Sequence, residues 1–146
     1  MKPRTRARSV ALQVLYEYDQ SQHQVGSIFQ TRLEENPLDE NLLTFSQKII
    51  SGVFPIIQDL DEQIAKFAPE WPFDQVAIID RNILRIALWE MVFDQETPIK
   101  VIINEAIELG KLFGSDATPR FVNGVLGSLV DNQNTIKQCL LNKHSI

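Results

Sequence analysis

The spacing of apolar residues between positions 101 and 127 constrains the fold of this chain more than any other feature. The first part of the segment carries apolar residues on one face of a helix, at intervals of four, three and four positions: Ile102, Ala106, Leu109 and Phe113. This spacing predicts a helix from about Pro98 to Phe113, a turn at residues 114–116, and a second helix with Thr118 as its N-cap. Glycine costs about 1 kcal/mol inside a helix. We therefore expect Gly124 and Gly127, in the second helix, to serve close packing of another helix.

The same helical period predicts further helices over most of the chain. They are expected at residues 5–20, 25–34, 39–67, 74–93 and 134–141. The third is expected to be bent at Pro55, because proline lacks an N–H and clashes with the preceding turn. The fourth is apolar almost all round, which is typical of a helix at the centre of a bundle. The sequence shows no β-type alternation and no repeat, so the predicted fold class is all-α.

Composition favours one folded domain over residues 1–146. The chain is 44% hydrophobic and 23% charged, a balance that excludes a mainly disordered protein. No apolar run approaches the roughly 20 residues that span a bilayer, and the N-terminus lacks the apolar core of a signal peptide. The single cysteine, Cys139, excludes an intramolecular disulfide and suits a reducing compartment. The expected localisation is cytoplasmic, without a membrane partner.

Charge is unevenly distributed along the chain. Residues 1–8 contain Lys2, Arg4, Arg6 and Arg8 without an acidic residue, whereas the remaining chain holds all 19 acidic residues and the net charge is −5. A basic N-terminal arm on an acidic body indicates a localised contact with an anion. The alternative is a solvated, frayed terminus.

The residue types that carry enzymatic chemistry do not form a convincing set. His23 and His144 lie in an expected loop and tail, and Cys139 has no obvious activating partner. Glu105 and Glu108 are three residues apart on one helix, a spacing that solvated helix acids commonly show. No glycine loop of the phosphate-binding kind is present. We therefore expect neither an enzyme nor a bound metal or cofactor.

Two features leave alternatives open. Trp71 lies in a turn with two prolines, and could be a core plug or an anchor for a partner. Arg81 and Arg85 form the one polar strip on their helix. They could bind phosphate, or could pair with nearby acids such as Asp80 or Glu90.

Five stretches of the sequence match a known family, and the last three, in this order, are the most specific: RARSVALQVLYEYDQ, LDEQIAKF, RNILRIALWEM, PIKVIINEAIELGKLFG and RFVNGVLG. On these stretches rests a resemblance to the NusB family of transcription antitermination factors. It implies a compact bundle of about seven helices in two roughly perpendicular halves of three-helix type. It also implies a non-catalytic adaptor that binds the boxA element of ribosomal-RNA leader transcripts as single-stranded RNA. Binding takes place together with NusE, a small-subunit ribosomal protein, and the complex joins the other Nus factors on RNA polymerase to suppress premature termination.

The resemblance further implies an RNA-binding surface. The residues that match the family's positions are Lys2, Arg4, Arg6, Arg8, Tyr16, Asp80, Arg120 and Phe121. Guanidinium groups neutralise phosphates, aromatic faces stack on unpaired bases, and a carboxylate can accept hydrogen bonds from base amino groups. We expect Arg120 and Phe121 to lie beside the basic arm and Tyr16.

Two other functions remain as alternatives. The first is the related RNA-binding domain that precedes some ribosomal-RNA cytosine methyltransferases. It would need a cofactor-binding domain and catalytic cysteines downstream, whereas this chain is expected to end at Ile146 with only Cys139. The second is a helical adaptor that binds proteins alone, for which alanine at Arg4, Arg6 and Arg8 would leave RNA affinity unchanged. The apolar stripes fit a monomer and a dimer equally well.

Overall fold

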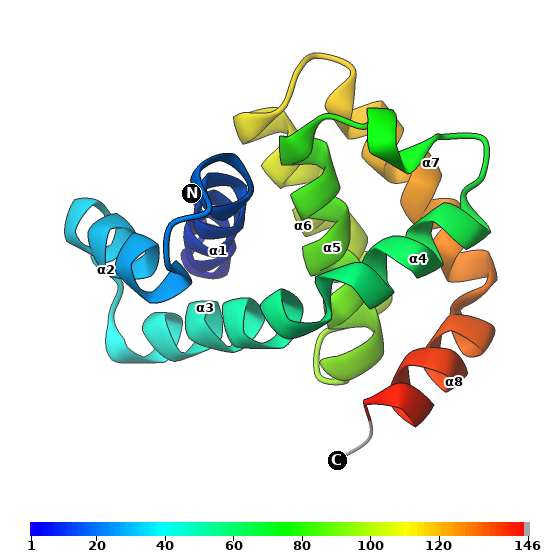
Figure 1. Cartoon of the computed structure of the whole chain (residues 1–146). Helices are drawn as coiled ribbons and strands as arrows, with labels where there is room; N and C mark the ends of the chain where they lie inside the picture. Colours follow the sequence, from blue (N-terminus) through cyan, green and yellow to red (C-terminus); the bar gives the residue numbers. More distant parts are fainter. Residues whose placement is uncertain (145–146) are drawn as a thin grey trace. The chain divides into compact units, whose positions relative to one another are not determined.

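The computed structural model describes residues 1–144, and every regular element in that range is helical (Figure 1). The α-helices are α1 (Pro3–Ser21), α2 (Val25–Glu35), α3 (Glu40–Val53), α4 (Ile57–Phe67), α5 (Ile78–Phe93), α6 (Ile99–Phe113), α7 (Thr118–Asp131) and α8 (Gln133–Lys143). Two short 3-10 helices are η1 (Phe54–Ile56) and η2 (Phe73–Gln75). The all-α class is confirmed. None of the described helices is long and apolar enough to cross a membrane.

The chain divides into two compact units, which we call unit 1 (Met1–Pro55) and unit 2 (Ile56–Ile146). The boundary coincides with the proline of η1, which separates α3 from α4. The expected bent helix over residues 39–67 is therefore two helices. Proline removes a backbone donor and clashes with the turn before it, so the α-helical hydrogen bonds do not continue through this point. The chain is expected from its sequence to end at Ile146. That residue lies outside the described range of 1–144, so the structure does not test this expectation.

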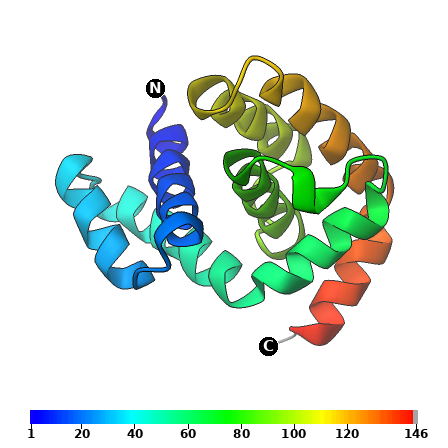
Figure 2. The same cartoon turned by 45° about the horizontal axis from the view of Figure 1, so that its top comes forward.

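In unit 1, α1 packs against α2 and α3 (Figures 1 and 2). The apolar face of α1 is buried: Ala7, Val10, Ala11, Leu12, Val14 and Leu15. Tyr18 is half-buried, and its ring meets that of Phe54 edge-on with the centroids 4.8 Å apart. Asp39 caps α3, because its carboxylate accepts a hydrogen bond from the Leu42 N–H at 3.0 Å.

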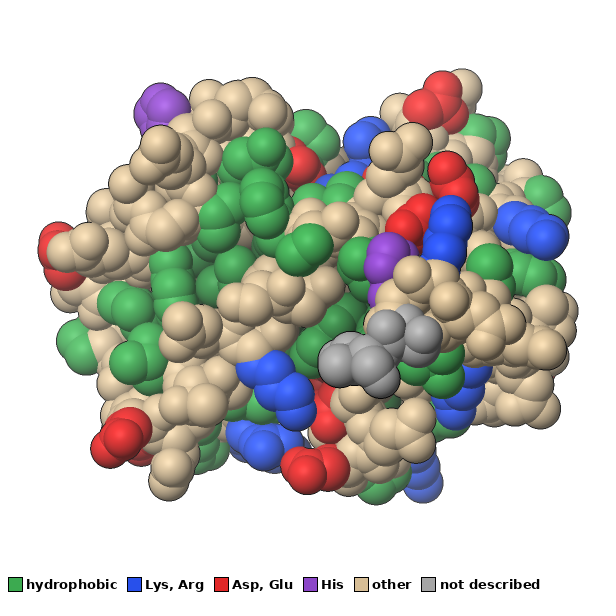
Figure 3. All heavy atoms as spheres, turned by 60° about the horizontal axis from the view of Figure 1, so that its bottom comes forward, with side chains coloured by type: hydrophobic (Ala, Val, Ile, Leu, Met, Phe, Trp, Pro, Cys, Tyr) green, Lys and Arg blue, Asp and Glu red, His purple; other side chains and the backbone are tan. Residues whose placement is uncertain are grey.

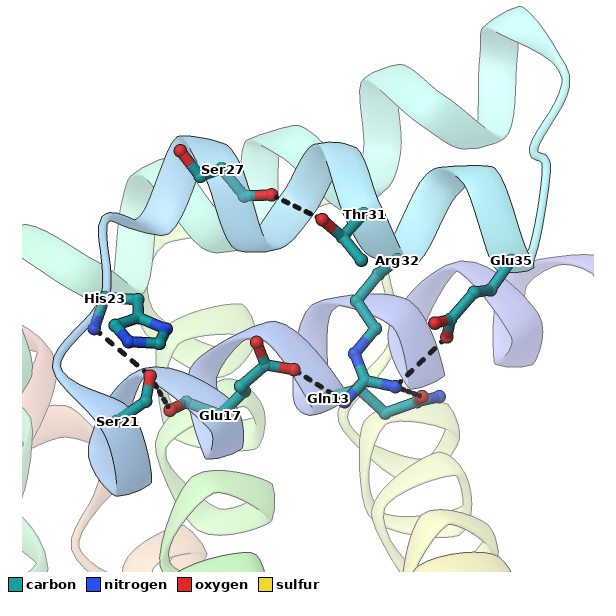
Figure 4. A network of polar contacts seen from close by, with 8 residues as sticks. All are labelled: Gln13, Glu17, Ser21, His23, Ser27, Thr31, Arg32 and Glu35. Atoms are coloured by element: carbon teal, nitrogen blue, oxygen red, sulfur yellow. Dashed lines mark hydrogen bonds and ion pairs between the residues drawn. The ribbon is translucent and has the colours of Figure 1, made fainter.

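A polar network ties α2 to α1 (Figure 4). Arg32 of α2 donates to Gln13 Oε1 at 3.2 Å and to Glu17 Oε1 at 2.7 Å, both on α1. It also reaches Glu35 on its own helix at 3.4 Å. The guanidinium therefore links the exposed sides of two helices whose apolar sides form the core of unit 1.

In unit 2, α5 is the central helix and packs against α4, α6, α7 and α8. Residues 82–92 are all buried, as the continuous apolar pattern predicted. The helix begins at Ile78, later than the expected residue 74, because the backbone at Val76 and Ala77 is extended. Arg81 stabilises this extended segment by donating to the carbonyl of Val76 at 3.0 Å and to that of Asp74 at 3.3 Å.

Arg85 connects α5 to α4. Its Nε and Nη2 donate to the two carboxylate oxygens of Asp61, each at 2.7 Å, and Arg85 is only 4% exposed. The pairing of Arg85 with an acid is confirmed, but the acid belongs to another helix and is not the neighbouring Asp80. A planar guanidinium and a carboxylate match in this two-bond geometry.

The segment from α6 to α7 follows the predicted pattern on its buried side. The apolar residues of α7 face the core and are buried: Val122, Val125, Leu126 and Leu129. The predicted role of Gly124 and Gly127 is wrong. A Cβ at Gly124 would meet the Trp71 ring at 3.4 Å rather than a helix, and a Cβ at Gly127 would meet nothing within 4 Å.

The close approach of α6 and α7 takes place at other glycines. A Cβ at Gly110 would lie 3.0 Å from Thr118 Cγ2, and a Cβ at Gly114 would lie 2.6 Å from the same atom. Both distances are at or below the shortest that side chains tolerate, so the start of α7 packs against the end of α6 because these two residues lack side chains.

The end of α8 is tied to α4 at the surface of unit 2. Lys143 Nζ lies 2.9 Å from Asp59 Oδ1, and His144 Nε2 lies 2.6 Å from Asp59 Oδ2. Acidic (red), basic (blue) and histidine (purple) side chains gather at this place in Figure 3. The hydrogen bonds from Lys143 and then His144 hold the pKa of Asp59 below its usual value.

Candidate nucleic-acid interface

The basic N-terminal residues form the first turns of α1 rather than a separate arm. The helix begins at Pro3, with Lys2 in the N-cap position. Lys2, Arg4 and Arg6 are exposed, and the first turn contains no acidic residue. The N-terminus of a helix carries partial positive charge and ordinarily favours acidic side chains. Basic residues at this end add to the positive potential and make an anion-binding surface.

Two of the arginines also pack on an aromatic ring of α3. The guanidinium carbons of Arg4 and Arg8 lie 4.2 Å and 5.0 Å from the ring centroid of Phe45. Arg8 is only 2% exposed, whereas Arg4 remains at the surface. Of the four basic residues predicted to bind RNA in unit 1, three are therefore exposed, and Arg8 is buried beneath them.

Tyr16 lies on the same helix, two turns after Arg8. Its side chain is half-buried and its hydroxyl accepts a hydrogen bond from Gln20 Nε2 at 3.3 Å. Eight residues of helix correspond to about 12 Å along the axis. The helix α1 therefore contains four of the eight predicted residues, with Lys2 as its N-cap, and Arg8 is the buried one among them.

Asp80 lies in the first turn of α5 in unit 2. Its Oδ1 accepts a hydrogen bond from the hydroxyl of Thr118 at 2.9 Å, and that hydroxyl in turn accepts from the Ser115 N–H at 3.0 Å. The prediction of Thr118 as the N-cap of α7 is wrong. Thr118 is the first helical residue, after Ala117, and its side chain bonds to Asp80 and to the turn instead.

The carboxylate of Asp80 is half-buried. Burial raises its pKa, and the hydrogen bond from Thr118 partly offsets that increase. Oδ1 is engaged by Thr118, while none of the residues from 1 to 144 donates to Oδ2. An acceptor therefore remains available at the protein surface.

Asp80 and Phe121 line one cavity of about 310 Å³ in unit 2. The remaining lining residues come from the segment between α4 and α5: Trp71, Pro72, Gln75, Val76 and Ala77. The rings of Trp71 and Phe121 are nearly perpendicular, at 86°, with their centroids 6.1 Å apart. Arg120, next to Phe121 on α7, is exposed and does not line the cavity.

Trp71 is the functional candidate that the sequence left undecided. Its ring packs against Gly124 and is half-buried, so it is a plug; the same ring is also a wall of the cavity. Pro69 and Pro72 on either side were the available signal, because they exclude the segment from a helix. The partner of Trp71 on α7 could not be read from these prolines.

Other features of the described residues do not form a site of a different kind. No three or more His, Cys, Asp or Glu side chains between residues 1 and 144 are grouped so that they could hold a metal ion. A second cavity, of about 440 Å³, lies in unit 1 between the end of α1 and α2, and is lined by none of the predicted residues.

Comparisons with known proteins point to one family. A model of the NusB family matches residues 5–131. The transcription antitermination protein NusB of Chloroflexus aggregans is 43% identical over 129 residues, which cover 87% of this chain and 86% of that protein. The protein of the same name from Roseiflexus sp. is 45% identical over 129 residues, or 87% of this chain and 91% of the relative.

Solved structures show the same fold. NusB of T. maritima superposes with a TM-score of 0.78 at 28% identity, over 94% of this chain and 92% of that one. A crystal structure of the antitermination factors NusB and NusE in complex with double-stranded RNA matches with a TM-score of 0.78 at 25% identity. That match covers 95% of this chain and 98% of the other.

Proposed function

Because the chain belongs to the NusB family of transcription antitermination factors, we propose that it binds the boxA element of ribosomal-RNA leader transcripts. It binds this element as single-stranded RNA and together with NusE. Family membership also confirms that the chain is not an enzyme, since the family is non-catalytic. Relatives of similar length carry the antitermination name, which favours this function over a methyltransferase module.

The observation that carries the proposal is the first turn of α1. Lys2, Arg4 and Arg6 project from the positively polarised end of a helix, and no acid in that turn neutralises them. Phosphate groups bound there release counterions, and this release drives the association of proteins with nucleic acids. Arg8 lies buried beneath this surface against Phe45, and Tyr16 offers a ring for an unpaired base further along the helix.

Unit 2 carries further residues that we propose to contact RNA. Phe121 provides an aromatic ring, Asp80 a hydrogen-bond acceptor, and Arg120 an exposed cation for the RNA backbone. In this proposal both units contact RNA, so that residues 1–146 act as a single RNA-binding domain. The NusB structure bound to NusE and double-stranded RNA supports both partners. Through NusE the protein joins the other Nus factors on RNA polymerase, in the cytoplasm.

Alanine at both exposed arginines tests the proposal. Affinity for single-stranded boxA RNA is measured over a range of salt concentrations for the wild type and for Arg4→Ala/Arg6→Ala. The slope of log K against log salt is expected to fall by about 1.4, since each phosphate contact to single-stranded RNA contributes about 0.7. The affinity of this variant for boxA RNA at low salt should also be lower than that of the wild type.

A matched control removes two charges from another part of the chain. Lys100 and Lys111 are exposed residues of α6, and the variant Lys100→Ala/Lys111→Ala has the same net charge as the arginine variant. It is expected to keep the wild-type slope. If the arginine variant binds RNA as tightly as the control, the basic turn has no RNA contact and a protein-binding adaptor is favoured.

A further inference from the structure

We infer that the cavity of unit 2 bounded by Trp71, Asp80 and Phe121 takes one unpaired guanine base, and that Asp80 selects it. The inference rests on the proposed function and deepens it, because it assigns a base specificity to part of the RNA surface. It also adds Trp71 as a base-contacting residue.

The walls of the cavity suit a flat aromatic ligand. The perpendicular rings of Trp71 and Phe121 allow a base to stack on one face while it meets the edge of the other. The volume of about 310 Å³ is at the lower end of the range for small-ligand sites, about 300–1,000 Å³. Gly124 lets the Trp71 ring pack on α7, with 3.4 Å to the position a Cβ would take, so this wall is held in place.

The polar group in the cavity accepts hydrogen bonds and does not donate them. An ionised carboxylate has only acceptor sites. Thr118 fixes the orientation of Asp80 through Oδ1, which leaves Oδ2 without a donor among residues 1–144. Oδ2 is not among the buried polar atoms that lack a partner in the described part of the chain, so it is open at the surface to a ligand with N–H groups.

Among the four bases, guanine fits such an acceptor best. Its Watson–Crick edge presents N1–H and the N2 amino group side by side, which matches the two lone-pair directions of a carboxylate. Adenine and cytosine present one amino group beside a ring nitrogen acceptor that would face the carboxylate. Uracil presents one N–H between two carbonyl groups. Each of these three bases brings at least one acceptor against Asp80.

The cavity is not built for a phosphate. None of its lining residues is basic, and Asp80 would repel an anion. Arg81, the next residue on α5, donates to the carbonyls of Val76 and Asp74 and so stabilises the segment beside the cavity. The base rather than the backbone of the RNA is therefore the group that fits.

The test measures coupling between the residue and the base. The probes are single-stranded boxA RNA and the same RNA with each guanine in turn replaced by inosine, which lacks the N2 amino group. At one position the replacement should weaken wild-type binding about tenfold, as expected for a lost hydrogen bond to a charged group. Asp80→Asn keeps the shape and the bond from Thr118 but turns the free acceptor into a donor. In this variant guanine and inosine RNAs should bind equally.

Asp74→Asn is the matched control. Asp74 is exposed, lies close to Asp80 in the chain and does not line the cavity. The substitution makes the same change in charge, so this variant should keep the tenfold difference between the guanine and inosine RNAs. Equal effects of inosine in the wild type and in Asp80→Asn would overturn the inference.

Tryptophan fluorescence gives an independent measurement. Stacking of a base on Trp71 should quench its emission when boxA RNA is added, whereas Trp89 is 6% exposed and should contribute a constant signal. Trp71→Phe keeps an aromatic wall and should abolish the quenching. Quenching of equal size in Trp71→Phe would show that no base stacks on Trp71.

Two further outcomes separate this inference from the proposed function. A wild-type protein that does not bind boxA RNA at all would overturn both. A wild-type protein that binds boxA RNA without one guanine coupled to Asp80 would overturn only the inference. If Asp80→Asn weakens the binding of NusE in the absence of RNA and leaves RNA affinity unchanged, the cavity takes a protein side chain instead.

Discussion

At the scale of single residues, two glycines of unit 2, Gly114 at the end of α6 and Gly127 within α7, have different roles. Gly114 faces the side chain of Thr118 so closely that a methyl group would lie 2.6 Å from Cγ2, whereas a methyl group at Gly127 would meet nothing within 4 Å. The first glycine is needed for packing. The second carries only the cost of a flexible residue in a helix.

Alanine at these positions should therefore have opposite effects. Gly114→Ala is expected to lower the free energy of unfolding by about 1–3 kcal/mol, because Thr118 must move. Gly127→Ala should raise it by about 0.4–1 kcal/mol, since it restricts the unfolded chain without a clash. Urea unfolding of the two variants measures both. A Gly114→Ala protein as stable as the wild type would contradict the packing described here.

Thr118 joins three parts of unit 2 through one hydroxyl. Thr118→Val keeps a similar shape and leaves both Asp80 and the Ser115 N–H without their partner. The free energy of unfolding should fall by about 1–3 kcal/mol. The pKa of Asp80 should rise further, because the hydrogen bond from Thr118 lowers it in the wild type. Carboxyl NMR titration measures this pKa; an unchanged or lower value would exclude the bond.

At the scale of helices, unit 2 is held together by side chains that cross between elements. Arg85 of α5 binds Asp61 of α4, and Asp59 of α4 binds the end of α8. The first contact is largely buried and fixes α4 on the central helix. The second lies at the surface and depends on pH, since it requires an ionised carboxylate.

The acid dependence of the contact to α8 has a definite direction. Because the pKa of Asp59 is lowered in the folded state from about 3.8, its contribution to stability is present above that value. The contribution is lost as the pH falls through the lower, folded pKa. Unfolding of the wild type and of Asp59→Asn is compared from pH 6 down to pH 2. The wild type should be the more stable at pH 6, and the difference should close at the acid end.

A difference that stays constant over this range would mean that Asp59 acts through something other than its charge. Glu70→Gln serves as the control, since Glu70 is an exposed acid of the same unit. This variant should follow the pH profile of the wild type.

At the scale of the whole molecule, the sequence predicted the positions of individual helices but not the contacts between them. The helices α2 and α6 followed from the spacing of apolar residues and from the residues at their ends. The start of α5 did not, because it depends on the bonds that Arg81 makes to the extended segment before it. The helical period records which residues face the core and does not record which segment they meet.

The sequence likewise could not show which residues of the candidate site lie together. The resemblance to a family supplied Asp80 and Phe121, but only the folded chain shows that they share a cavity with Trp71. It also shows that Arg8 is buried while Arg4 is exposed, a difference that a run of basic residues cannot reveal. The assignment of these residues to RNA remains a prediction.

The central claim is that this member of the NusB family reads boxA RNA together with NusE. Fluorescence anisotropy at one fixed salt concentration measures the affinity for boxA RNA and for a scrambled RNA of the same composition, each with and without NusE. We predict tighter binding of boxA than of the scrambled RNA, with a preference that NusE increases. Equal affinity for the two RNAs in the presence of NusE would contradict the claim.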